Sequence, residues 1–157
     1  MRHRTRPTAV IVGALGLLLA VAGIAMATTI KGTKGDDTLT GTENADKIVG
    51  KKGDDTITGL AGNDKLLGKK GSDTVSGDED NDTVDGGNGP DSLDGGTEND
   101  KLDGGEGIDT IAGSDGDDKI KSRGDGKKAD EVTCGEGEDT VRADRNDTVA
   151  DDCENVR

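Results

Sequence analysis

The residues with the clearest chemistry are aspartates that recur every nine positions. They are Asp37, Asp46, Asp55, Asp64, Asp73, Asp82, Asp91, Asp100, Asp109 and Asp118, followed with looser spacing by Asp130 and Asp139. Carboxylates are hard oxygen ligands, and stacked copies would repel one another unless a cation lay between them. The series therefore predicts a divalent cation, and Ca²⁺ suits it better than Mg²⁺ because calcium coordination is larger and less regular. Solvated surface charge is the plain alternative.

Two further residue types share the period of the aspartates. An aliphatic residue stands two positions after each aspartate from Asp37 to Asp118, and a glycine stands five positions before it. Glycine favours tight turns, whereas the residues around the aliphatic position favour strands. Each unit is thus predicted to be a turn followed by a short strand. So short a strand buries one side chain on one face, so the unit must stack on copies of itself.

The unit Gly86–Asp94 reads GGNGPDSLD and matches the nonapeptide G-G-x-G-x-D-x-U-x. On this motif the chain resembles the repeats-in-toxin (RTX, hemolysin-type) calcium-binding repeat family, closely over residues 32–121 and more loosely beyond. The resemblance implies an all-β fold, a right-handed parallel β-roll (β-solenoid) with two units per coil. It also implies that several Ca²⁺ ions lie between stacked turns, held by the twelve aspartates named above and by turn carbonyls.

Some units depart from the family pattern. The fourth position, usually glycine, holds Asn44, Asp80 and Glu98, and the second position is glycine only at Gly87, Gly96 and Gly105 among the units up to Lys121. Glutamate adopts a left-handed backbone poorly. The strongest sites are therefore expected between Gly86 and Asp109.

Composition argues that apolar burial alone does not hold the fold. Hydrophobic residues make up 28% of the chain and aromatic residues 0%, well below an ordinary globular domain. The predicted core is one aliphatic layer thick, so we expect folding to be coupled to calcium binding.

The N-terminal segment indicates export. Arg2, Arg4 and Arg6 precede an apolar run over residues 9–25 that ends in Ala-Met-Ala, which is typical of a signal peptide. A retained membrane anchor is the alternative. The expected organisation is a signal peptide over 1–27, the calcium-binding β-roll over 28–121, and degenerate repeats with a disulfide-closed cap over 122–157, in a secreted, extracellular protein.

The charge and the missing side chains restrict the partners. Residues 1–27 contain three arginines, the single histidine and no acid, so the exported chain would carry 17 Lys and Arg against 34 Asp and Glu. Such a chain should repel nucleic acid and anionic membranes. The exported chain would have no histidine and no aromatic ring. It therefore cannot form a histidine-containing catalytic triad, a two-histidine metal site or a sugar site that relies on ring stacking. Paired carboxylates could hydrolyse glycosides, but no pair stands out. We therefore predict no enzyme activity.

The residues beside the aliphatic positions define two outer faces. Alternate units present mainly Thr and Ser on one face, from Thr38 to Thr110, and several lysines on the other, from Lys47 to Lys121. The hydroxyl face resembles ice-binding solenoids, and the lysine face could bind a cell-wall or other extracellular polymer. Plain solubility and local charge balance are the alternatives.

Cys134 and Cys153 are the two cysteines of the chain. In an exported protein an even pair predicts a disulfide, here one that closes the C-terminal end.

Overall fold

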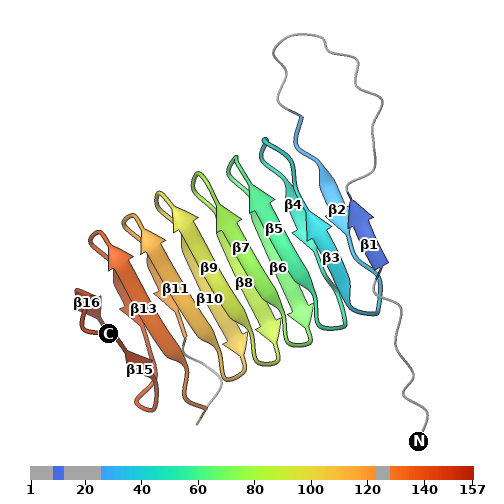
Figure 1. The fold of residues 1–157 in the computed structure, drawn as a ribbon. Coiled ribbons are helices and arrows are strands. Elements are labelled where there is room, and N and C mark those ends of the chain that lie inside the picture. Colours follow the sequence, from blue (N-terminus) through green and yellow to red (C-terminus); the bar gives the residue numbers. More distant parts are fainter. Residues whose placement is uncertain (1–8, 13–25, 123–127) are drawn as a thin grey trace, which may run out of the picture.

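The computed structural model describes residues 9–12, 26–122 and 128–157 of the chain. The described residues form strands and connections without a helix (Figure 1). The strands are β1 (Ala9–Val12), β2 (Thr29–Lys31), β3 (Asp37–Thr40), β4 (Lys47–Val49), β5 (Thr56–Leu60), β6 (Lys65–Lys70), β7 (Thr74–Asp78), β8 (Thr83–Asn88), β9 (Ser92–Thr97), β10 (Lys101–Glu106), β11 (Thr110–Asp115), β12 (Lys119–Lys121), β13 (Glu131–Glu136), β14 (Thr140–Arg142), β15 (Thr148–Val149) and β16 (Asn155–Val156).

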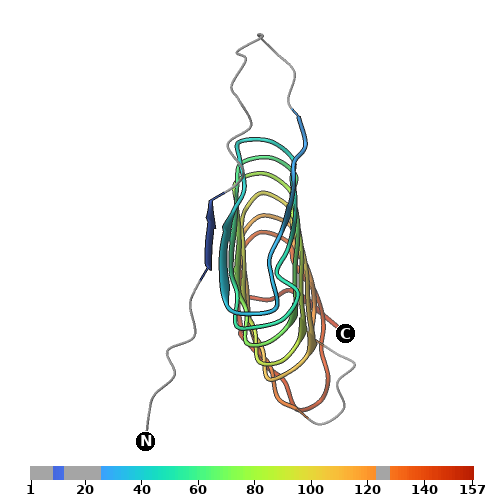
Figure 2. The ribbon, with the colours of Figure 1, turned by 90° about the vertical axis from the view of Figure 1, so that its right-hand side faces the viewer.

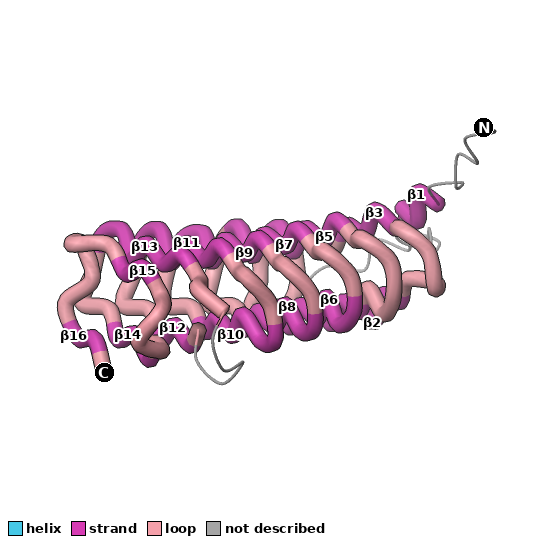
Figure 3. The backbone as a smooth tube through the Cα atoms, turned by 90° about the horizontal axis from the view of Figure 1, so that it is seen from below, coloured by secondary structure: helices cyan, strands magenta, loops and turns pink. Residues whose placement is uncertain are grey.

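Two parallel sheets make up the molecule, and the chain alternates between them. Sheet A contains the odd-numbered strands in the order β1-β3-β5-β7-β9-β11-β13-β15, and sheet B contains the even-numbered strands from β2 to β16. Figure 2 shows the successive coils nested behind one another, and Figure 3 shows the two rows of strands on opposite sides. This is the parallel β-solenoid that the repeat predicts, with two nonapeptides per coil.

The pairing register places identical repeat positions side by side. Leu39 pairs with Ile57 in sheet A, and Ile48 pairs with Leu66 in sheet B. In each case the partner lies two repeats further along the chain. The register follows from alternation, because a slip of one residue would turn each aliphatic side chain to the solvent.

The core is a single layer of aliphatic side chains between the sheets. Each is at most 5% exposed, and the predicted positions in this layer are Ile30, Leu39, Ile48, Ile57, Leu66, Val75, Val84, Leu93, Leu102, Ile111 and Ile120. Val132 and Val141 extend it.

The C-terminal strands continue the roll. Ile111 pairs with Val132, so the connection between β12 and β13 is longer than its predecessors, yet β13 and β15 still extend sheet A while β14 and β16 extend sheet B. The longer spacing after Lys121 is thus absorbed in one connection, and the last coils are shorter, since Val132 pairs with Val149 and Val141 with Val156.

At the N-terminal end, β1 pairs with β3 and adds a strand to sheet A. The rest of the predicted signal peptide lies outside the described residues, apart from residues 26 and 27. Among the described residues, no helix is long and apolar enough to cross a bilayer.

Candidate metal centre

The twelve predicted ligands all lie inside the roll. Each side chain is at most 4% exposed, from Asp46 at 4% to Asp139 at 0%. Each aspartate precedes the aliphatic residue of its strand by two, so its side chain points to the same inner side of the coil. Charged groups are almost never fully buried unless they are paired, so these carboxylates call for a physical explanation.

The aspartates form two ladders along the roll axis. In the sheet A ladder, Oδ1 of Asp55 accepts a hydrogen bond from the backbone N–H of Asp37 at 2.9 Å, and Oδ1 of Asp73 accepts one from Asp55 at 2.9 Å. The same contact continues up to Asp130. The sheet B ladder runs from Asp46 to Asp139 with distances of 2.6–2.8 Å. The structure therefore brings the predicted residues together as two rows of stacked carboxylates.

The second carboxylate oxygen is left without a partner in most rungs. Oδ2 is buried and accepts no hydrogen bond within the described structure in Asp55, Asp64, Asp73, Asp82, Asp91, Asp100, Asp118 and Asp139. A buried, unsatisfied carboxylate oxygen costs several kcal/mol in a folded protein. The repetition of the same orphan atom along both ladders is the feature that a bound cation would explain.

Each orphan oxygen except that of Asp139, whose repeat has Cys134 at the first position, faces a glycine and the coil beyond it. A Cβ placed on Gly86 would lie 2.5 Å from Oδ2 of Asp91 and 2.7 Å from the carbonyl oxygen of Gly104. These two oxygens therefore converge on the same glycine. Carboxylate and carbonyl oxygens are the donors that Ca²⁺ takes, in flexible geometry. The residues present thus fit a calcium ion at each such place.

The glycines of the first repeat position are required for space. Gly86 and its equivalents are not among the residues with positive φ, whereas most residues at the second and fourth positions are. The first-position glycine is therefore not required for a left-handed backbone. The glycine leaves room for the buried carboxylate and for the next coil.

Burial raises the pKa of the ladder carboxyls. The pKa rises to about 6 in Asp55, Asp64 and Asp118, and to about 7 in Asp82, Asp91 and Asp100. Desolvation is the main cause in each case, and the backbone hydrogen bond from the preceding rung opposes it. Repulsion between neighbouring aspartates raises these pKa values further. Without a bound metal, the ladders therefore disfavour the ionised form of these carboxyls at neutral pH.

The first rung of each ladder differs from the others. Oδ2 of Asp37 accepts a hydrogen bond from the backbone N–H of Thr33 at 2.5 Å, and Oδ2 of Asp46 accepts one from Thr42 at 2.7 Å. The threonine turns thus satisfy the oxygen that is orphaned elsewhere. Asp37 and Asp46 are predicted ligands whose surroundings differ from those of the inner rungs.

Side chains at the second and fourth positions do not disrupt the turns. Lys51, Leu60 and Lys69 occupy the second position with φ of 93°, 84° and 88°, and Glu98 occupies the fourth with φ of 68°. All four adopt the left-handed backbone that glycine would take, at an energetic cost. The coil geometry therefore persists where glycine is replaced, both outside the segment from Gly86 to Asp109 and, at Glu98, within it.

The last acceptor of each ladder is not among the twelve predicted ligands. Asp147 accepts a hydrogen bond from the backbone N–H of Asp130 at 3.1 Å, and Glu154 accepts one from Asp139 at 3.0 Å. Asp147 stands two residues before Val149, and Glu154 two before Val156. Allowing glutamate at the sixth position would have found Glu154.

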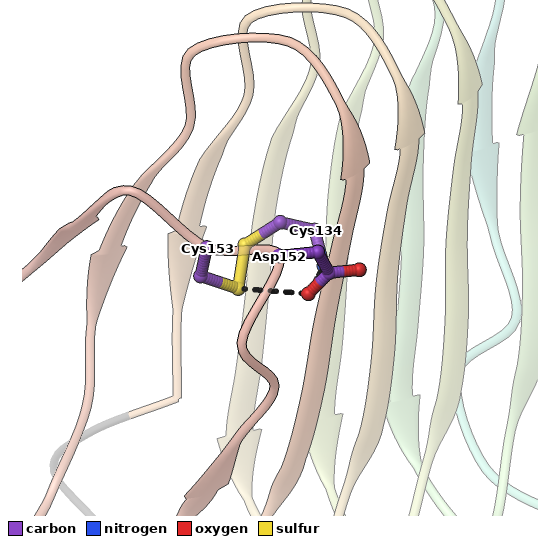
Figure 4. A group of neighbouring side chains, drawn as sticks. All are labelled: Cys134, Asp152 and Cys153. Carbon is purple, nitrogen blue, oxygen red and sulfur yellow. Dashed lines mark hydrogen bonds between the residues drawn. A yellow bond between two sulfur atoms is a disulfide. The ribbon is translucent and has the colours of Figure 1, made fainter.

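The C-terminal cysteines form the predicted disulfide. Cys134 and Cys153 are bonded, with Cα atoms 5.2 Å apart, and Figure 4 shows Asp152 beside them. Cys134 lies between Thr133 and Gly135, which pair with Ala112 and Ser114, so it occupies the position of Gly113 in the preceding coil. Oδ2 of Asp152 accepts a hydrogen bond from the backbone N–H of Gly135 at 3.2 Å. The disulfide therefore closes the end of the roll, and its sulfurs are not available as thiolate ligands.

Comparison with known protein families agrees with this geometry. No curated protein matched the chain in a sequence search. The family model of the RTX calcium-binding nonapeptide repeat matches in four copies, at residues 23–57, 40–75, 58–93 and 94–126. These matches cover most of the roll, including the ladders from Asp37 to Asp118. The chain, with its stacked nonapeptides and buried aspartate ladders, therefore belongs to the RTX calcium-binding nonapeptide repeat family.

Proposed function

We propose that this chain is an exported, non-catalytic protein whose β-roll folds when Ca²⁺ binds along its two aspartate ladders. The observation that carries the proposal is the row of buried Oδ2 atoms without a hydrogen-bond partner, most of which lie beside a first-position glycine that also faces a turn carbonyl. Ca²⁺ would supply the positive charge that offsets their burial. The proposed ligands are the twelve predicted aspartates together with carbonyls of the glycine turns.

The coupling of folding to calcium follows from the thin core. The aliphatic layer is one side chain deep, whereas the ladders bury about as many carboxylates as aliphatic groups. Without cations, the desolvation and mutual repulsion of the carboxylates oppose the same coils that the aliphatic layer stabilises. Binding free energy then becomes folding free energy, because the ladders exist only in the stacked state.

The test is far-ultraviolet circular dichroism of residues 28–157 in chelator, in millimolar Ca²⁺ and in millimolar Mg²⁺ at equal ionic strength. We expect the β signal and a compact radius by small-angle scattering in Ca²⁺ only. An equally compact chain after complete removal of calcium would disprove the coupling. Export is tested separately by the N-terminal residue of the secreted protein, which should be Thr28.

The hydroxyl face of sheet A offers a second candidate function, in adhesion or ice binding. Thr38, Thr56 and Thr74 are neighbours in register, and Ser92 and Thr110 continue the column. The neighbouring column of outward-facing side chains, two positions further along each strand, has Asp94 and Ala112 in place of residues with hydroxyl groups. A single column of hydroxyl groups is a narrow surface for binding ice. Ice binding is tested by measuring thermal hysteresis of the calcium-loaded protein, which should be present if this function is correct.

A further inference from the structure

The positive charges of the roll lie on one side. Every described lysine and arginine from residue 26 onward lies on sheet B, on a connection from sheet B to sheet A, or at the end of the chain after β16. Sheet A and the connections that leave it carry none within the described ranges, although they carry exposed acids such as Glu43, Glu79 and Asp115. An acidic protein therefore has one side that is not uniformly acidic.

The lysines of this side gather in the first three coils. We name the lysine patch as the following set on β2, β4, β6 and the turns after β2 and β4: Lys31, Lys34, Lys47, Lys51, Lys52, Lys65, Lys69 and Lys70. All are exposed except Lys69, which is half-buried. In the next two coils the corresponding turns carry Asn88 and Glu106 instead. The patch thus ends abruptly along the roll.

Few acids offset the patch. Lys69 forms an ion pair with Asp85 at 3.2 Å, and the Lys51 ammonium donates to the carbonyl of Gly32. Apart from the buried ladder aspartates, Asp36 and Asp54 are the acids of the adjoining turns, and Oδ1 of each accepts a hydrogen bond from a backbone N–H of the next coil. No other ion pair involves the patch within the described residues. Several ammonium groups therefore remain available to an external anion.

The patch surrounds aliphatic surface. Val49 and four of the lysines line a shallow hollow of about 400 Å³, and Leu67 pairs with Val49 in register beside it. Both aliphatic side chains lie on the outer face and are partly exposed. The surface thus combines dense positive charge with a small apolar strip.

These features select the chemistry of the partner. Lysine ammonium groups bind phosphate as point charges without requiring planar, bidentate geometry. The chain has no aromatic residue, so it cannot stack nucleic-acid bases or sugar rings. A flexible chain of phosphodiesters joined by short aliphatic units offers both the charge and the apolar contact.

We infer that the lysine patch binds a linear phosphodiester polymer with aliphatic linkers. The acids of sheet A do not prevent this, because the sheets lie about 10 Å apart and screening acts over about 8 Å at physiological salt. The inference goes beyond calcium binding, although the patch exists only in the folded roll. Binding therefore requires calcium for the fold and lysine for the contact.

The experiment measures binding to immobilised poly(glycerol phosphate) by biolayer interferometry, at a fixed free calcium concentration. Four exposed lysines are replaced in Lys47→Gln/Lys52→Gln/Lys65→Gln/Lys70→Gln. Affinity should fall by about two orders of magnitude, and the slope of log affinity against log salt should shrink by about 3. Circular dichroism of each protein in the same buffer separates lost binding from lost folding.

A matched pair of double variants makes the test specific. Lys47→Gln/Lys65→Gln and Lys101→Gln/Lys119→Gln remove the same charge from the same repeat position, and each pair is neighbours in register. Only the first should weaken binding. Equal loss from both, or no binding by the folded wild type, overturns the inference. So does binding restricted to vesicles with phosphatidylglycerol, or lysine-dependent self-association without polymer.

Discussion

Oδ1 of Asp91 accepts a hydrogen bond from the backbone N–H of Asp73 at 2.8 Å, while Oδ2 of the same carboxylate accepts none. One oxygen thus ties two coils together and the other is left bare between them. The same difference between the two carboxylate oxygens repeats along both ladders. It determines whether a substitution at one of these aspartates should raise or lower the stability of the roll.

Asp91→Asn should have opposite effects with and without calcium. Asparagine keeps an oxygen for the backbone of Asp73 but removes the buried charge, so the metal-free chain should be unchanged or more structured. In saturating calcium the variant should unfold at lower denaturant concentration, because a ligand is lost. The measurement is urea unfolding in calcium and in chelator. Asp115→Asn, at the exposed end of β11, is the control and should behave as wild type in both.

Without calcium, acid should favour the fold. The pKa of Asp82, Asp91 and Asp100 is about 7 in the folded roll, against 3.8 for a free side chain. The folded state therefore binds more protons between these values, so its stability is greatest below about pH 4 and is lost as the pH rises through 7. Circular dichroism in chelator should show β structure at pH 5 that disappears at pH 7.5. In calcium the trend should reverse, because protons compete with the ion.

Gly86→Ala should destabilise the roll because a methyl group would overlap the carboxylate of Asp91 and the carbonyl of Gly104. Overpacking of this kind costs about 1–3 kcal/mol. Gly35→Ala is the matched control, since a Cβ there meets nothing within 4 Å and no positive φ is required. Chemical denaturation in calcium distinguishes the two. Equal midpoints would contradict the steric role of the first-position glycine.

Loss of the Cys134–Cys153 disulfide should lower stability in calcium by about 3 kcal/mol on the chain-entropy model. The double variant Cys134→Ala/Cys153→Ala and the reduced wild type should unfold at similar, lower denaturant concentrations. Calcium titration of the N-terminal coils should change little, because those coils are remote from the cap. Unfolding midpoints that do not depend on reductant would argue against a stabilising role.

Much of the fold could be predicted because the repeat constrains it tightly. The period of nine places Leu39 and Ile57 in the same column, and alternation leaves one register that buries both. The ladder of aspartates follows from the same register, which is why all twelve predicted ligands are found buried.

The remaining features depend on contacts between coils that the repeat does not encode. Thr33 satisfies Asp37 through its backbone N–H, which any residue could supply in that turn conformation. Leu60 and Glu98 adopt positive φ against their own preference because the coils on either side hold the turn. Glu154 extends the sheet B ladder by one rung, and a pattern restricted to aspartate at the sixth repeat position does not include it.

Each coil contacts only its two neighbours, so the roll is a one-dimensional stack. The cross-link at Cys134 clamps the last coils, whereas the opposite end has no such clamp within the described residues. As ions are withdrawn, the coils should therefore peel away in order from the amino-terminal end. When only some of the calcium sites are occupied, the protein would then be a shortened rod whose amino-terminal coils are unfolded. Amide hydrogen-exchange rates should accordingly fall steadily from β2 toward β13.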